Sequence, residues 1–313
     1  MGLLIRLLRM IATLVLASVL VFGLALMVPG DPAYTLAGEA ATPEQVEHIR
    51  ATLGLDVPPH QQYFNWVGRV ITGDFGRSIF TGQSVSKEII NRLPVTLSLA
   101  LLTVIFSVIF SVLIGLIASL RRGTWIDRTV TGAASVAMAM PEFWVGLLLV
   151  SSLGLSLRLF PVAQYVPFAK DPGQWFMHLV MPAMALGLTK TAELARQVRS
   201  SMSLVLDENY IRTARAKGLR TWQIIGKHAL KNAGTAFVTV LGVRIAVLLG
   251  GVIVIERVFA LPGLGSLMVT SVISRDLPMV QGAALVVATM VLLINFLVDL
   301  SYRFFDPKVR IGT

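Results

Sequence analysis

Long runs of apolar residues decide what this chain can fold into. Leu93–Leu120 and Leu277–Val298 contain no charged side chain, and Met10–Gly30 carries none before Asp31. A helix needs about 20 such residues to cross the hydrocarbon core of a bilayer. The chain is 55% hydrophobic and only 14% charged, whereas soluble domains contain about 25% charged residues. The sequence therefore predicts an integral membrane protein.

Three further apolar runs carry one or two interruptions. They are Thr129–Leu157, Trp175–Thr189 and Ala233–Ile255. The first is broken by Pro141-Glu142, and we expect the proline to kink its helix because it removes a backbone donor and crowds the preceding turn. The second is short and runs into Lys190, and the third contains Arg244. The six runs together predict an all-α fold of six transmembrane helices.

The distribution of lysine and arginine predicts the orientation of these helices. With the N-terminus in the cytoplasm, the segments on that side are 1–9, 121–128, 196–232 and 303–313. They hold 16 basic residues against four acids, while the segments on the other side hold nine of each. Basic residues are enriched in cytoplasmic loops. The net charge of +10 is thus explained by topology and does not call for a nucleic-acid partner.

The first apolar run has two interpretations, a cleaved signal peptide or a retained helix. It is longer than the 7–15 apolar residues of a signal peptide, and the sequence PGDP follows where small residues would mark a cleavage site. These observations favour a retained transmembrane helix over residues 1–30.

The segment 31–92 is too long for a simple connection and predicts a small extracellular or periplasmic subdomain. Thr42-Pro43-Glu44-Gln45 is typical of a helix start with a capping box. The subdomain is either a docking surface for an external partner or a structural lid. In the later loop Ile255–Gln281, two glycines and two prolines predict a re-entrant or sharply turned segment.

Six ionisable residues fall within or at the ends of the apolar runs. They are Glu142, Lys190, Glu193, Arg244, Glu256 and Asp299. Charges in a membrane are costly, and they mark a pathway or a buried pair. Lys190 and Glu193 are spaced i, i+3, which predicts a structural pair on one helix face. Glu142 and Arg244 either line a substrate path or neutralise each other across a helix interface.

The chain lacks the motifs of catalysis. It has no cysteine, no phosphate-binding G-x-x-x-x-G-K-[ST] loop, no G-x-S-x-G and no histidines at metal-ligand spacing. A membrane enzyme would need a catalytic set, and an ion-coupled secondary transporter would need midplane charges and inverted repeats. A protein that moves a substrate without transforming it, and that has no metal site, is the interpretation these absences favour.

A basic segment, Glu208–Asn232, lies between two apolar runs and reads ENYIRTARAKGLRTWQIIGKHALKN. It resembles the EAA loop of ABC importer permeases, with Gly218 on the motif glycine and Arg212-Thr213-Ala214 on the E-A-A triplet. The departures from E-A-A are similar to those of the oligopeptide/dipeptide/nickel permease family. Further blocks resemble that family in order: PGDP (29–32), GDFGRS (73–78), RLPVTLSLAL (92–101), MPEFWVGLLL (140–149), FALPGLGSL (259–267), SRDLPMVQG (274–282) and NFLVDLSYRFFDPKVR (295–310).

The resemblance implies a type I ABC importer permease fold with both termini in the cytoplasm. It implies an N-terminal helix (1–30), an outer subdomain (31–92), a five-helix core (93–302) with the EAA coupling loop at 196–232, and a cytoplasmic tail (303–313). The partners implied are a second related permease, two cytoplasmic ATPases and an external solute-binding protein, all in or at the bilayer. ATP and magnesium would be bound by the ATPases, and this chain would hold no cofactor.

The family handles di- and oligopeptides, and also nickel chelates, glutathione and opine-like metallophores. Peptide is the substrate that the resemblance favours. Residues expected to couple to the ATPase are Tyr210, Arg212, Thr213, Ala214, Arg215, Ala216, Lys217, Gly218 and Leu219. The resemblance implies two short helices, Asp207–Lys217 and Thr221–Lys231, with Gly218 at the turn between them. The small residues of the first helix would let it enter a groove on the ATPase. Candidates for the translocation path are Glu142, Arg244 and Glu256. Candidates for docking of the binding protein are Asp74, Phe75, Pro262, Gly263, Arg275 and Asp276.

Overall fold

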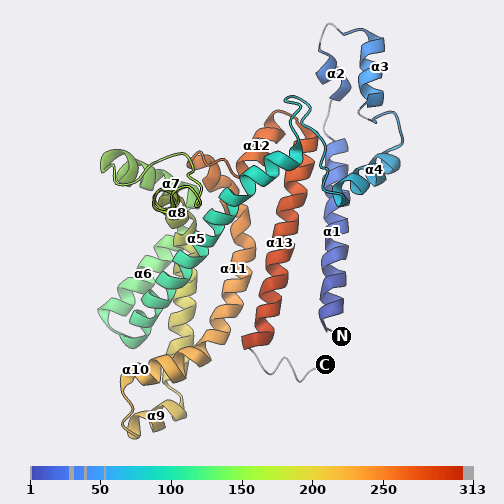
Figure 1. The fold of residues 1–313 in the computed structure, drawn as a ribbon. Coiled ribbons are helices and arrows are strands. Elements are labelled where there is room, and N and C mark those ends of the chain that lie inside the picture. Colours follow the sequence, from blue (N-terminus) through green and yellow to red (C-terminus); the bar gives the residue numbers. More distant parts are fainter. Residues whose placement is uncertain (1, 28–31, 39–40, 53, 306–313) are drawn as a thin grey trace. The chain divides into compact units, whose positions relative to one another are not determined.

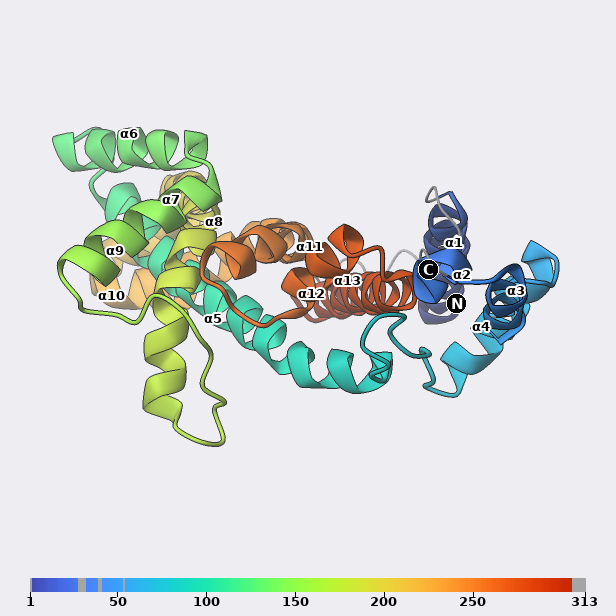
Figure 2. The same cartoon turned by 90° about the horizontal axis from the view of Figure 1, so that it is seen from above.

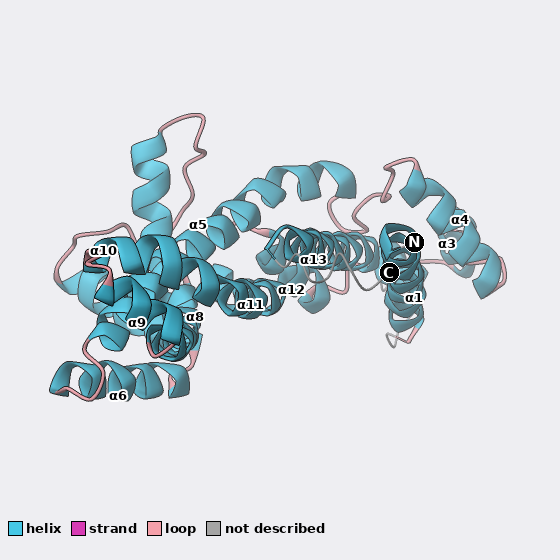
Figure 3. Cartoon of the chain, turned by 90° about the horizontal axis from the view of Figure 1, so that it is seen from below, coloured by secondary structure: helices cyan, strands magenta, loops and turns pink. Residues whose placement is uncertain are grey.

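The computed structural model describes residues 2–27, 32–38, 41–52 and 54–305, and the elements of this part are helices joined by loops (Figures 1 and 3). The chain divides into two compact units. Unit 1 comprises Met1–Pro94 and Gly263–Leu292, and unit 2 comprises Val95–Pro262 and Leu293–Thr313. Most of the expected tail, from residue 306 onward, lies outside the described residues.

Unit 1 holds α1 (Gly2–Leu26), α2 (Pro32–Ala37), α3 (Pro43–Thr52), α4 (Pro59–Ile71) and α12 (Leu264–Ile273). Unit 2 holds α6 (Trp125–Ala139), α7 (Glu142–Leu149), the π-helical turn η1 (Val150–Ser156), α8 (Pro172–Leu206), α9 (Asn209–Ala216), α10 (Thr221–Gln223), the π-helical turn η2 (Ile224–Ala229) and α11 (Leu230–Val258). The long helices α5 (Val85–Leu120) and α13 (Leu277–Phe305) each contribute to both units.

Three described helices are long and apolar enough to cross a membrane: the segments Ile5–Leu26, Val85–Leu120 and Leu277–Val298. Two bent helix pairs raise the number of candidate spans to as many as five. The fold is thus a helical membrane protein, as the apolar runs predict. Helix α5 begins eight residues before the expected apolar run, because its polar first turns are helical too and are supported by the i, i+4 ion pair of Glu88 and Arg92 at 3.0 Å.

The third apolar run is broken, as Pro141 predicts, but the break is sharper than a kink. Helix α6 ends at Ala139, and the segments Trp125–Ala139 and Glu142–Ser156 meet at 102° (Figure 2). Met140 adopts an extended conformation with φ −83° and ψ 126°. The ring of Pro141 disfavours a helical conformation for the residue before it, so the helix has to stop there.

The fourth apolar run is only part of α8, which has 35 residues. At 1.5 Å a residue it is about 52 Å long, whereas the hydrocarbon core is about 30 Å thick. Its backbone approaches α5 closely at Gly115, where a Cβ atom would lie 2.6 Å from the carbonyl oxygen of Ala195. Small residues allow such close helix contacts in membranes. Helix α8 is therefore a largely buried helix of unit 2 and is longer than the hydrocarbon core is thick, and it is not among the candidate spans of the described residues.

In unit 1, α4 packs on α1. Phe22 of α1 contacts the rings of Tyr63 and Trp66 of α4 at 5.5 and 5.7 Å, and Ser18 and Tyr63 share a hydrogen bond of 2.8 Å. The expected capping box is present at α3, with Thr42 N donating to Gln45 Oε1 at 3.0 Å. Helices α3 and α4 are therefore held by specific contacts, and the placement of segment 31–92 as a subdomain outside the cytoplasm stays a prediction.

The loop after α11 turns sharply, as its glycines and prolines predict. Ala260 and Arg275 have positive φ angles of 48° and 58°, and the short apolar helix α12 lies between them. In unit 1, the carboxylate of Asp276 accepts a 2.5 Å hydrogen bond from Ser78 Oγ and a 3.2 Å one from Ile79 N. The loop before α5 and the loop before α13 are thereby joined.

Candidate functional site

Helix α9 is amphipathic, and its two faces differ in what they contact. Ile211 and Ala214 are buried in a cluster with Met202 of α8 and with Ile224 and Ala229 of η2. The opposite face is exposed and carries Arg212, Thr213, Arg215 and Ala216, and the exposed Lys217 follows directly after the helix. The chain therefore holds α9 by its apolar face and leaves a basic face with two small residues open.

Gly218 ends this short helix with a φ of +76°. Nothing lies within 4 Å of the position where a Cβ atom would be, so backbone conformation and not space requires glycine. The chain then enters α10, whose start is capped by the hydrogen bond from Arg220 N to Gln223 Oε1 at 3.1 Å. This is the helix–turn–helix that the sequence predicts.

The second helix was expected to end at Lys231, and this is wrong. Helix α10, the turn η2 and helix α11 form one continuous helical path from Thr221 to Val258 (Figure 1). Lys231 and Asn232 are polar, but polarity alone does not break a helix. The surface around α9 is therefore directly continuous with an apolar helix of unit 2.

The nine expected coupling residues do not all face outward. Ala214 is only 9% exposed and packs inside the cluster, so its small size serves the chain's own packing. Leu219 is half-buried against the same cluster. Tyr210 is 41% exposed, and its hydroxyl accepts a 2.7 Å hydrogen bond from Asn232 Nδ2. Seven of the nine residues are thus exposed: Tyr210, Arg212, Thr213, Arg215, Ala216, Lys217 and Gly218.

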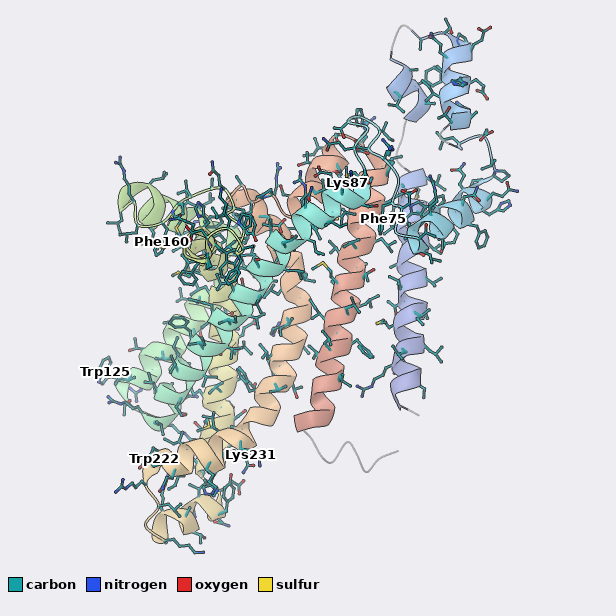
Figure 4. All side chains as sticks on the ribbon, viewed as in Figure 1. Phe75, Lys87, Trp125, Phe160, Trp222 and Lys231 are labelled. Carbon is teal, nitrogen blue, oxygen red and sulfur yellow. The ribbon has the colours of Figure 1, made fainter. Side chains whose placement is uncertain are left out.

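Trp222 lies next to this surface and was not expected from the sequence (Figure 4). It is 67% exposed and lines a shallow pocket of about 420 Å³ with Leu219, Lys227 and His228. An exposed tryptophan on a short helix after the glycine turn is the signal that could have identified it, because large exposed aromatic residues are enriched at protein interfaces. We call α9, Gly218 and the Trp222 pocket the coupling surface.

Two ion pairs connect the region near the coupling surface to α6 and to the turn that precedes α6. Arg199 of α8 binds Asp127 of α6 through two hydrogen bonds, with Nη2 2.7 Å from Oδ2. The Asp127 side chain is only 5% exposed. Asp207, directly after α8, pairs with Arg122 at 2.7 Å, but this pair is exposed. Sequence reasoning missed both pairs because each joins residues more than 70 positions apart.

Two more ion pairs lie nearer the start of α8 than Arg199 does, and they correct the expected pairing of Lys190 with Glu193. Lys190 pairs with Glu142 at the start of α7, and Glu193 pairs with Arg244 of α11 at 2.8 Å. The i, i+3 pair of Lys190 and Glu193 is not formed among the described residues, and Glu142 and Arg244 do not neutralise each other. Helix α8 packs against both α7 and α11, so each of its charges meets an opposite charge on a different neighbour.

The third path candidate, Glu256, is fully buried near the end of α11. Its Oε1 accepts a 2.6 Å hydrogen bond from Thr96 Oγ1 of α5. The Glu142 side chain is 20% exposed and that of Arg244 is 40% exposed. Of the three candidates, Arg244 is therefore the most accessible within this chain.

The docking candidates differ in exposure. Asp74, Pro262 and Arg275 are exposed, whereas Gly263 and Asp276 are buried. Phe75 is half-buried and packs in the cluster of Phe22, Trp66 and Leu285. Asp276 holds the loop around Ser78, as described above. The exposed candidates are therefore the ones available to a partner, and Phe75 and Asp276 support the loop from inside.

Comparison with known proteins identifies the family. The family model described as binding-protein-dependent transport system inner membrane component matches residues 111–311, and the model of its N-terminal region matches residues 2–100. A putative peptide transport system permease protein of Brucella abortus is 42% identical over 97% of each chain. The dipeptide transport system permease protein DppB of Escherichia coli is 38% identical over 97% of each chain.

A solved structure shares the fold. An inward-facing structure of the MetNI methionine ABC transporter superposes with a TM-score of 0.58 at 18% sequence identity, covering 70% of this chain and 96% of that chain. The protein is a multi-pass protein of the inner membrane. The family models together cover most of the chain, which therefore belongs to the binding-protein-dependent transport system inner membrane components, the permease subunits of ABC importers.

Proposed function

We propose that this chain is one permease subunit of an ATP-driven importer of di- or oligopeptides. It forms half of the translocation pathway, and a second related permease forms the other half. Two ATPase subunits in the cytoplasm and an external solute-binding protein complete the complex. The chain crosses the membrane six times with both termini inside. It hydrolyses no ATP itself, and its partners bind the nucleotide and magnesium.

The coupling surface is the observation that carries this proposal. The exposed face of α9, together with the following Lys217, presents three cations and two small residues, while the apolar face of α9 is held by α8 and η2. A helix fixed in this way moves with the helices that hold it. Closure of the ATPases against α9 would thus displace α8 and α11 and alter the access to the pathway.

The ion pairs of α8 support transmission of that movement. Lys190, Glu193 and Arg199 each bind a different neighbouring helix, and α8 leads within three residues into α9. Ion pairs in a low-dielectric environment resist separation more than exposed ones do. A displacement of α9 would therefore be passed to α6, α7 and α11 together.

Peptide as the substrate is supported by the relatives. Those 38–42% identical over nearly the whole chain carry names of peptide or dipeptide transport systems. Arg244 and Glu142 are our candidates for contact with the charged ends of a peptide in transit. The Arg244 side chain is 40% exposed, so a peptide carboxylate can reach it and replace Glu193 as its partner.

Reconstitution tests the proposal. The tagged chain is extracted gently from membranes of its own source, and the proteins that co-purify are identified. We expect a second permease and an ATPase, and we expect the complex in vesicles to take up a labelled dipeptide when ATP and the binding protein are supplied. Uptake by the chain alone on a proton or sodium gradient would show a secondary transporter and contradict the proposal.

A further inference from the structure

A cleft in unit 1 has no role in the coupling described above. Its volume is about 690 Å³, within the range of small-molecule sites. It is bounded by the end of α1, by α3 and α4, by the loop around Phe75 and by the start of α13. Figure 4 labels Phe75, beside the end of α1 and α4.

The floor of the cleft is made by a membrane span. Phe22, Ala25 and Leu26, from the last two turns of α1, line it together with Trp66 and Phe75. Only 11% of the apolar window of α1 is buried within the chain. An apolar surface that begins in the cleft and continues along an apolar span is the environment of an acyl chain.

One wall of the cleft is polar and cationic. Gln62, Asn65, Trp66 and Arg69 lie on one face of α4 at helical spacing, and Arg77 faces the same cleft from the following loop. Within the part of the chain that the structure describes, neither guanidinium forms an ion pair with a carboxylate. Among the described residues that line the cleft, Asp74 is the one acid, and it accepts a hydrogen bond from Gly76 N.

The position of α4 fits a membrane surface. Helix α4 is held against α1 by the hydrogen bond between Tyr63 and Ser18. Its apolar side chains Phe64 and Ile71 are nevertheless 68% and 79% exposed. An amphipathic helix with exposed aromatic residues lies in the interfacial region of a bilayer. This would put the two arginines at the depth of lipid headgroups.

From these observations we propose that the cleft binds one phospholipid. Its acyl chain lies along Phe22, Ala25 and Leu26, and its phosphate is bound by Arg69 and Arg77. The amide side chains of Gln62 and Asn65 contact the glycerol and ester oxygens. A peptide segment of an external protein would satisfy the arginines, but it would leave the apolar floor inside the bilayer unexplained.

Native mass spectrometry of the full-length chain, purified in a mild detergent with the subunits that accompany it, tests this site. Phosphatidylglycerol is added back after delipidation, beside diacylglycerol with the same acyl chains and beside inorganic phosphate. We expect one phosphatidylglycerol to be retained per chain and neither of the other two probes. Binding of diacylglycerol as tight as that of phosphatidylglycerol, or retention of phosphate alone, would overturn the site.

A double variant shows where the lipid is bound. Arg69→Ala with Arg77→Ala should lower retention of phosphatidylglycerol by roughly fivefold for each arginine removed. The matched control is Lys87→Ala with Lys170→Ala, which removes two exposed cations outside the cleft lining and should leave retention unchanged. Both double variants retaining lipid like the unaltered chain would contradict the proposal. If the chain with Arg69→Ala and Arg77→Ala keeps its lipid but no longer binds an external protein, the lipid site is contradicted as well and the cleft is a protein-docking surface.

Discussion

Arg199 and Asp127 form a two-point contact between α8 and α6, with Nη2 of the arginine 2.7 Å from Oδ2 of the aspartate. Oδ1 of Asp127 accepts from Arg199 Nε, and Oδ2 also accepts a 3.0 Å hydrogen bond from Gly123 N, so both oxygens are satisfied. The contact lies two turns before the end of α8, the helix that leads into the coupling surface. It is therefore placed to keep α6 and α8 together when α9 is displaced.

Asp127→Asn should destabilise the chain. The change leaves Arg199 without its charge partner, and we expect the free energy of unfolding to fall by about 3 kcal/mol. This is the lower end of the range for a buried pair, because the arginine side chain is 31% exposed. Asp207→Asn is the control, since its pair with Arg122 is exposed and contributes about 0–1 kcal/mol. The melting temperatures of the two purified variants give the comparison. Equal melting temperatures would show that the Asp127–Arg199 pair stabilises the chain no more than the exposed pair does.

The pair of Lys190 and Glu142 predicts rescue by exchange. Glu142→Lys or Lys190→Glu alone places two like charges together among α7, α8 and α11 and should lower the yield of folded protein severely. The double exchange restores opposite charges and should recover most of the loss. Size-exclusion profiles and melting temperatures of all three variants measure this. A double variant no better than either single one would mean that the pair does not hold α7 to α8.

Gly218→Val should leave the chain inserted and the ATPase bound but reduce uptake per ATP hydrolysed. A β-branched residue at a φ of +76° costs about 1–2 kcal/mol or more and would shift α9 from its position. Gly234→Val is the control, because Gly234 lies in α11 without a positive φ and a Cβ atom there meets nothing within 4 Å. Uptake and ATP hydrolysis are measured in the same vesicles. Normal coupling in the Gly218 variant would count against a fixed α9.

Trp222→Ala should weaken association with the ATPase. An exposed tryptophan beside a basic helix is the kind of residue whose removal costs about 2 kcal/mol or more in an interface. Trp125→Ala is matched in exposure, at 73% against 67%, but lies at the start of α6. The amount of ATPase retained on the tagged chain should fall roughly tenfold or more for Trp222→Ala only. If both variants retain the ATPase equally, the pocket at Trp222 lies outside the interface.

The sequence was sufficient for features set by local chemistry. Apolar length predicted a helical membrane protein, although three to five of the six expected spans are found among the described residues. Pro141 predicted the break between α6 and α7, Thr42 and Gln45 the capping box, and Gly218 the turn after α9. Family blocks spread over the whole chain identified the permease. Apart from the family blocks, each of these signals lies within one short stretch of the sequence, and each is governed by helix geometry, backbone conformation or the cost of burying charge.

The sequence was not sufficient for contacts between distant residues. Spacing paired Lys190 with Glu193, but packing presents each of them to another helix, where Glu142 and Arg244 lie. Likewise, the small size of Ala214 was expected to serve a partner, although the residue faces the chain's own core. Which face of an amphipathic helix is covered depends on the tertiary neighbours, and these are not encoded at a fixed spacing.

Site-specific cross-linking tests the central claim, that the exposed face of α9 contacts the ATPase, most directly. The chain contains no cysteine, so Ala216→Cys and Ala214→Cys each introduce one thiol, on the open and the buried face of the same helix. Both variants are treated with a photoactivatable maleimide in membranes that contain the whole complex. The account predicts that Ala216→Cys cross-links to the ATPase and that Ala214→Cys does not. Cross-linking of neither variant, or of both equally, would contradict it.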